Sequence, residues 1–180
     1  MTVIAGIADG SRVWIGGDSA GVSALNLTIR KDTKVFHRGP FLVGFTSSFR
    51  MGQLLQYSLD TPERPEGISD HEYMATRFVD AVRSCLKAGG YARKENEEES
   101  GGTFLVGYHG HLYCIESDYQ VGETASGYDA VGCGFNIALG SLYSTDDPLN
   151  HPRNRIRIAL NAAATWSAGV SAPFVIEELA

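Results

Sequence analysis

The chain has 180 residues, of which 43% are hydrophobic and 20% are charged, and its formal net charge at pH 7 is −6. This length suits one domain with its own core, so we expect residues 1–180 to form a single domain. The negative charge argues against binding to nucleic acid, which needs a basic surface to neutralise phosphates. No apolar run approaches the roughly 20 residues of a membrane-spanning helix, so we expect no membrane association.

Cysteine usage points to a reducing compartment. The chain has three cysteines, which are Cys85, Cys114 and Cys133. Their number is odd, no pair has CxxC spacing, and the N-terminus lacks the basic and apolar segments of a secretory signal. We therefore expect free thiols in a cytoplasmic protein.

The first predicted hairpin joins apolar runs over residues 3–8 and 12–15 through the turn signal Asp9-Gly10. If the turn centres near Gly10, residues whose numbers sum to about 20 face each other. Thr2 then lies opposite the Asp18-Ser19 region, because cross-strand neighbours are about 5 Å apart.

The second predicted hairpin joins residues 34–37 and 41–45. With a turn centred between Arg38 and Gly39, Lys34 faces Val43, beside Gly44. Residues 19–32, between the hairpins, are small and polar and predict a loop.

Helical spacing follows over residues 51–59. Ser69 and Glu72 form a capping box, which predicts a helix that starts near Asp70 and ends at Gly89-Gly90. The remaining predicted elements are a solvated charged loop over 91–102, strands over 103–108 and 112–116, helices over 137–143 and 152–166, and a strand over 174–176. This order indicates an α+β fold with antiparallel sheets.

Metal and cofactor motifs fail on inspection. His71-Glu72 lacks the second histidine of a zinc helix, and there is no phosphate-binding loop. His109 and His111 flank Gly110, and we expect them to border an exposed turn rather than to bind a metal. The sequence therefore predicts neither a metal nor a cofactor.

Several short segments carry a resemblance that runs the whole length of the chain. They are Thr2-Val3-Ile4, Gly17-Asp18-Ser19, residues 30–35, Val43-Gly44-Phe45, residues 132–139 and residues 174–179. With them the chain resembles the proteasome family of N-terminal-nucleophile hydrolases, and most closely the HslV-type bacterial peptidases and their relatives. The spacing of Thr2, Asp18 and Lys34 fits that family without gaps.

The resemblance implies a four-layer αββα sandwich and a threonine endopeptidase that cuts unfolded polypeptides. Thr2 would be the nucleophile after removal of Met1, and its free α-amine would be the base. The family also implies a homo-oligomeric stacked ring, for which an ATPase unfoldase is a conceivable partner. The sequence names neither the ring size nor that partner.

The resemblance also implies roles for the other site residues. Lys34 would lower the pKa of the Thr2 amine, and Asp18 would keep Lys34 charged and oriented. The N–H near Ser47 would stabilise the oxyanion, with Gly44 as a second candidate. The substrate would pair, as an added strand, with Ser19, Ala20, Gly21 and Val22.

Three departures from the family pattern concern this site. Cys133 stands where the family has a serine next to the nucleophile, and a thiol is a weaker hydrogen-bond donor. Ala164 stands where proteasome subunits carry an aspartate, which leaves Ser167 as the polar candidate there. Ser47 and Ser48 replace glycines in the oxyanion segment.

Two other functions stay open at this point. If Met1 is retained, Thr2 has no free amine, and the chain would be a catalytically silent structural or regulatory ring subunit. A third alternative is an N-terminal-nucleophile amidase that acts on small molecules.

Overall fold

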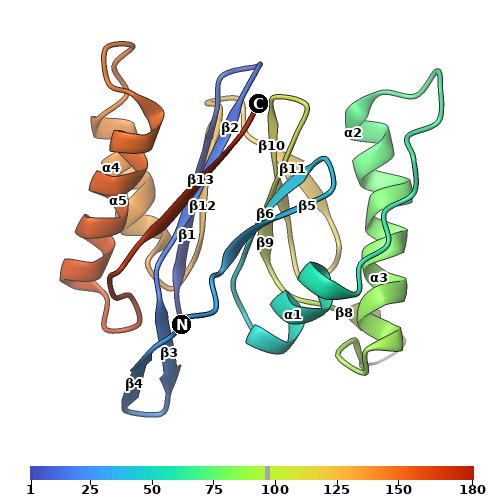
Figure 1. Cartoon of the computed structure of the whole chain (residues 1–180), viewed down its shortest axis with the longest axis horizontal. Helices are drawn as coiled ribbons and strands as arrows, with labels where there is room; N and C mark the ends of the chain where they lie inside the picture. Colours follow the sequence, from blue (N-terminus) through green and yellow to red (C-terminus); the bar gives the residue numbers. More distant parts are fainter. Residues whose placement is uncertain (96–97) are drawn as a thin grey trace.

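The computed structural model describes residues 1–95 and 98–180. Two antiparallel sheets lie face to face, and a layer of helices covers the outer face of each (Figure 1). The architecture is the four-layer αββα sandwich that the resemblance implies, and the α+β class is confirmed.

The first sheet has the strand order β12-β1-β2-β13. Its strands are β1 (Val3–Ala8), β2 (Val13–Gly17), β12 (Tyr128–Gly132) and β13 (Val175–Leu179). Helices α4 (Phe135–Ser144) and α5 (Pro152–Trp166) cover its outer face, on the left in Figure 1. Trp14, Ile156 and Leu160 are buried between these helices and the sheet.

The second sheet has the strand order β11-β10-β9-β6-β5. Its strands are β5 (Val35–Arg38), β6 (Phe41–Phe45), β9 (Phe104–Tyr108), β10 (His111–Ile115) and β11 (Val121–Glu123). Its outer face is covered by α1 (Phe49–Tyr57) and by the consecutive helices α2 (Asp70–Tyr73), η1 (Met74–Phe78) and α3 (Val79–Ala88). Ser69 caps this long helix by accepting the Glu72 N–H, as the capping box predicts.

The two sheets meet through a layer of aliphatic side chains. Gly44 lies inside this layer, where an added Cβ would lie 2.6 Å from both Ile4 and Ile15. At Gly17 an added Cβ would lie 2.7 Å from Ile4 and 3.1 Å from Val35. These glycines let the end of β2 approach the start of β5, which brings the two N-terminal hairpins together.

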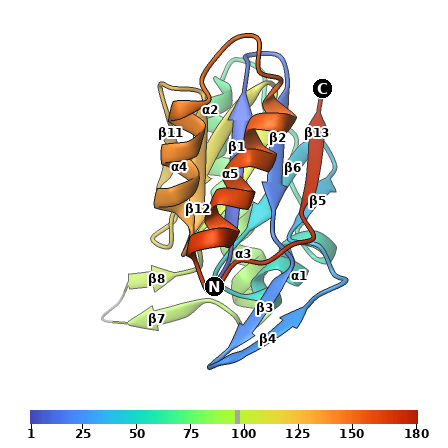
Figure 2. The same ribbon diagram turned by 90° about the vertical axis from the view of Figure 1, so that its left-hand side faces the viewer.

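Two segments predicted as loops contain short two-stranded ribbons. Residues 19–32 hold β3 (Ala20–Ser23) and β4 (Asn26–Ile29), which project from the sandwich beside the N-terminus (Figure 2). Residues 91–102 hold β7 (Arg93–Glu95) and β8 (Glu98–Ser100). The loop predictions were wrong. In β4 every residue is exposed, so backbone pairing with β3, and not burial of one face, defines that ribbon. The predicted solvation at 93–98 concerns side chains that the structure does not describe.

The hairpin registers differ from the predicted ones. In the first, Ile4 pairs with Gly17, so the numbers of paired residues sum to 21 rather than about 20. In the second, Val35 pairs with Gly44 because the turn is Gly39-Pro40 alone, with Arg38 paired to Phe41. Lys34 therefore lies beside Phe45, whose N–H donates to the Lys34 carbonyl at 3.0 Å, and the predicted pairing with Val43 was wrong.

The cysteines agree with a further expectation. Cys85, Cys114 and Cys133 are all free thiols. Among residues 1–95 and 98–180, no helix combines the length and the apolar character required to cross a bilayer.

Candidate functional site

Thr2, Asp18 and Lys34 converge where three strand ends meet. Thr2 immediately precedes β1, Asp18 follows β2, and Lys34 precedes β5. Their exposed fractions are 3%, 2% and 3%, so three polar side chains share one buried position. Buried polar groups are costly unless they are paired, so this cluster requires a complete set of partners.

The Lys34 ammonium joins the two other side chains. Its Nζ donates to Thr2 Oγ1 at 2.6 Å and to Asp18 Oδ1 at 2.8 Å. The Thr2 hydroxyl in turn donates to Asp18 Oδ1. The hydroxyl oxygen thus lies in direct contact with a cation and a carboxylate.

The Asp18 carboxylate is held by donors from several elements. Besides Thr2 and Lys34, it accepts backbone N–H groups from Val3 at 3.1 Å, Ala20 at 2.9 Å and Ser171 at 3.2 Å. A carboxylate whose contacts are all donors acts as an acceptor only, which is the role of its ionised form. Asp18 is therefore fixed in position before any substrate arrives.

Burial dominates the electrostatics of Lys34. Removal from water lowers the pKa of its ammonium below the ordinary 10.5, because burial penalises the charged form. The charge of Asp18 acts in the opposite direction and partly offsets this effect. Lys34 therefore places a desolvated cation directly against the Thr2 hydroxyl.

Cys133 and Ser167 lie on the backbone side of Thr2. The Thr2 N–H donates to Cys133 Sγ at 3.3 Å, and the thiol contacts the Thr2 carbonyl at the same distance. Ser167, at the end of α5, places its Oγ 3.5 Å from Cys133 Sγ. The structure therefore brings both sequence-predicted residues to the nucleophile candidate, on the side where a free amine would lie.

Gly132 permits the close approach of the Cys133 loop. Its φ is +98°, and an added Cβ would lie 2.4 Å from the Thr2 carbonyl oxygen. Only glycine fits both the conformation and the space.

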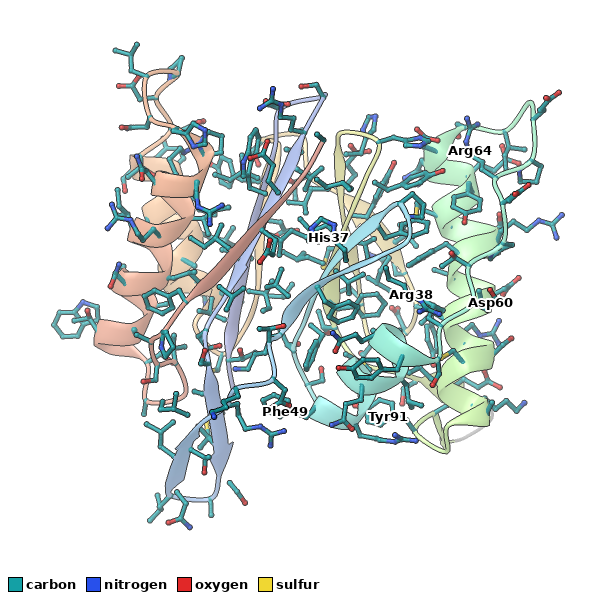
Figure 3. The ribbon with its side chains drawn as sticks, in the orientation of Figure 1. His37, Arg38, Phe49, Asp60, Arg64 and Tyr91 are labelled. Atoms are coloured by element: carbon teal, nitrogen blue, oxygen red, sulfur yellow. The ribbon has the colours of Figure 1, made fainter. Side chains whose placement is uncertain are left out.

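A small pocket opens beside the Thr2 side chain. It is lined by Met1, Thr2, Val22, Lys34, Phe45, Thr46, Ser47, Ser48 and Phe49. Phe49, labelled in Figure 3, comes from the first turn of α1. The Arg30 guanidinium lies 4.1 Å from the centre of the Phe49 ring, so a cation–π contact fixes this wall.

Ser47 offers a backbone donor at the edge of this pocket. Its φ of +61° places it in the left-handed region, and its hydroxyl accepts the Thr103 N–H at 3.1 Å. The Ser48 N–H donates to the Thr46 carbonyl, whereas within the described residues the exposed Ser47 N–H donates to no protein acceptor. Ser47 thus keeps a free donor where the sequence predicts the oxyanion site.

The other residues predicted for the oxyanion and substrate sites differ in their distance from this pocket. Gly44 is enclosed between the sheets and does not reach the pocket, so the structure gives no support to an oxyanion role for it. Ser19 and Ala20 are buried, and the Ser19 hydroxyl donates to the Pro173 carbonyl at 2.7 Å. Val22 lines the pocket, with Gly21 next to it on β3.

Sequence reasoning missed Thr46, Phe49 and Ser171 as parts of the site. Thr46 and Phe49 line the pocket, and the Ser171 N–H holds Asp18. Ser171 lies 153 positions from Asp18, and no local pattern marks such a contact. Phe49 directly follows the two serines of the oxyanion segment, and this position was the only feature of the sequence that could have placed it in the site.

Histidine and acidic side chains form no metal site in the described part of the chain. His109 contacts Asp70 at 3.2 Å, and His111 contacts Glu123 at 2.7 Å. The two histidines therefore have separate acidic partners.

Comparisons with known proteins place the fold. No protein-family model and no curated protein matches this sequence. Among solved structures, "BPH" from Thiobacillus denitrificans in complex with epoxomicin superposes with a TM-score of 0.80 at 17% identity, covering 99% of this chain and all of that one. The chain has the HslV-type proteasome-like fold.

Two further structures agree. Eukaryotic HslV from Trypanosoma brucei has a TM-score of 0.69 at 16% identity and covers 98% of both chains. Anbu, the ancestral β-subunit from Yersinia bercovieri, has a TM-score of 0.69 at 15% identity, over 99% of this chain and 81% of that one. These likenesses confirm the expected proteasome-like fold along the whole chain.

Proposed function

We propose that the chain is a threonine-type peptidase subunit that hydrolyses peptide bonds with Thr2 as the nucleophile once Met1 is removed. The observation that carries this proposal is the contact of the Thr2 hydroxyl with both Lys34 and Asp18 in a buried cluster. A surface threonine that follows an initiator methionine needs no such partners. The proteasome-like fold supports the same assignment.

The first chemical step forms a tetrahedral intermediate, which later collapses to an ester between enzyme and substrate. Thr2 Oγ attacks the peptide carbonyl carbon, and its proton passes to the α-amine of the same residue. A free α-amine has a reference pKa of about 7.7–8.0, so it suits a base at neutral pH. The Lys34 ammonium, 2.6 Å from the hydroxyl oxygen, stabilises the charge that develops there.

The tetrahedral intermediate then collapses. The Ser47 N–H stabilises its oxyanion, and the protonated amine gives its proton to the departing nitrogen as the C–N bond breaks. Water attacks the resulting ester with the same amine as base, which releases the second product and restores Thr2. Cys133 Sγ, 3.3 Å from the Thr2 nitrogen, holds that amine in place.

Substrate binding and assembly follow from the same proposal. β3 pairs with β4 along one edge, and no strand of the described chain pairs with its other edge. An extended polypeptide joins there beside Val22, as a strand added to a free edge. We propose that the subunit acts in the cytoplasm on unfolded polypeptides, in a homo-oligomeric ring with enclosed sites.

Peptide hydrolysis by matched variants tests this function. The processed wild type is expected to cleave unstructured peptides, whereas Thr2→Ala lowers kcat/KM by more than about 1,000-fold and leaves the fold intact. Thr2→Ser keeps a hydroxyl and an amine and retains measurable turnover. Peptidase activity that survives Thr2→Ala would refute the mechanism.

The mass of the protein separates this proposal from the catalytically silent subunit. Loss of Met1 frees the amine that the mechanism requires. A protein that assembles into a ring, retains Met1 and cleaves no peptide would instead be a structural or regulatory subunit. Cleavage of simple amides in preference to peptides would favour the small-molecule amidase.

A further inference from the structure

A second and larger cavity adjoins the Thr2 site. Its volume is about 370 Å³, and it is lined by Thr46, Thr103, Cys114, Glu116, Asp129, Ala130, Val131, Gly132, Phe135 and Leu139. Thr46 also lines the pocket beside Thr2, and Gly132 packs against the Thr2 carbonyl. The cavity therefore lies directly next to the nucleophile candidate.

Asp129 is a charged residue on a strand face where the sandwich usually has apolar side chains. Side chains alternate along β12, so Asp129 shares a face with Val131, which packs in the layer between the two sheets. Its neighbour Ala130 faces the helices instead. A carboxylate thus occupies an inward-facing position that strand alternation reserves for apolar residues.

Among the described residues, no cation pairs with this carboxylate. Within the part of the chain that the structure describes, Asp129 Oδ1 accepts the N–H of Ala130 at 2.7 Å and no side-chain donor. Glu116 accepts from the Thr103 hydroxyl and the Cys114 thiol, and none of the cavity-lining residues is Lys, Arg or His. Burial raises the pKa of Asp129, and the negative charge of Glu116 raises it further. Asp129 is half-buried, and a partly desolvated carboxylate without a cation beside it is typical of sites that bind a charged group.

The other walls suit an aliphatic stem. Val131, Phe135 and Leu139 are apolar, and they face the cavity together with Glu116 from the end of β10. A long, flexible side chain with a cationic head buries its methylene groups along apolar walls and places its charge at carboxylates. Lysine and arginine have this shape.

We propose that this cavity is a specificity subsite that takes a lysine or arginine side chain of the polypeptide held at Thr2. The inference rests on the proposed peptidase function. It adds a substrate class, namely polypeptides with a basic residue near the cleaved bond. Asp129 and Glu116 are the residues that select it.

The test compares lysine with its uncharged analogue norleucine at each position of an internally quenched octapeptide. For the wild type, kcat/KM is expected to favour lysine over norleucine by roughly tenfold or more at one position, because hydrogen bonds to charged groups are strong. In Asp129→Asn and in the double variant with Glu116→Gln, this ratio falls to about one. Glu123→Gln, at an exposed carboxylate outside both pockets, keeps the wild-type ratio.

Binding provides a second readout that needs no turnover. In Thr2→Ala, the lysine peptide is expected to bind about tenfold more tightly than the norleucine peptide, and the double variant removes this difference. Equal affinities in the Thr2→Ala protein, or a lysine preference that survives the double variant, would overturn the subsite. Cleavage of norleucine peptides by the wild type sustains the peptidase function in either case, so the two proposals fail separately.

Discussion

The two ends of the β-sandwich each carry a close pair of charged or titratable side chains, one buried and one exposed. At the N-terminal end, Asp18 and Lys34 form an ion pair with side chains 0% and 3% exposed. At the opposite end, His111 and Glu123 lie 2.7 Å apart with side chains 45% and 36% exposed. Water solvates the second pair, whereas the first depends on the protein alone.

This difference indicates where charge matters for function. An exposed pair contributes between about 0 and 1 kcal/mol, and its loss is tolerated. Removal of one partner of a buried pair costs about 3–5 kcal/mol, because the other charge is left uncompensated. A protein retains such an arrangement when its chemistry requires it, and here the pair surrounds the Thr2 hydroxyl.

The largest expected effect comes from Lys34→Met, which keeps the stem and removes the charge. Asp18 then loses its cation, so the free energy of unfolding is expected to fall by about 3–5 kcal/mol. Peptidase activity is expected to fall by more than about 1,000-fold. Urea unfolding and initial rates measure the two effects.

Glu123→Gln is the matched control at the other end. It removes a charge from the exposed pair and is expected to change stability by less than about 1 kcal/mol, with activity unchanged. If Lys34→Met and Glu123→Gln lowered the free energy of unfolding equally, the buried and the exposed pair would not differ in the way expected here.

A smaller effect is expected from Gly132→Ala. The new methyl group meets the Thr2 carbonyl, and the φ of +98° disfavours any residue with a Cβ. We expect a loss of about 1–3 kcal/mol in stability together with reduced activity. Gly122→Ala is the control, because a Cβ at that glycine meets no atom within 4 Å. If Gly132→Ala is as stable and as active as this control, the loop at Gly132 accommodates a methyl group and the prediction is wrong.

The smallest effect concerns pH. The pKa of Lys34 is lowered in the folded protein, so between that value and about 10.5 the unfolded chain holds more protons on Lys34 than the folded chain does. The cost of burying the ammonium is fully present below the folded pKa and is relieved as pH rises through this interval. The stability of wild type relative to Lys34→Met is therefore expected to increase with alkaline pH, as measured by urea unfolding; a decrease would contradict the sign of the shift.

The sequence predicted the parts of this site that depend on local pairing and on spacing. Thr2 and Asp18 meet because one hairpin brings the start of β1 beside the end of β2, and the family spacing added Lys34. The contacts that the sequence did not predict depend on packing between segments far apart in the chain. Ser171 reaches Asp18 across the fold, and the register at Lys34 depends on a tight turn at Gly39-Pro40.

Besides the two ribbons, two strands of the main sheets were absent from the prediction for physical reasons. β11 has only three residues. β12 carries Asp129 at an inward position, which breaks the apolar alternation by which a strand is recognised. Asp129, which breaks this alternation, is also one of the residues that line the second cavity.

Covalent labelling reports whether Thr2 is a nucleophile. The native protein is treated with a threonine-directed electrophile, and its N-terminal peptide is mapped by mass spectrometry. We expect a peptide that begins at residue 2 and carries the adduct there, with labelling lost in the Lys34→Met protein. A peptide that still begins with Met1 and carries no adduct, or an adduct found on Cys133 alone, would contradict this role of Thr2.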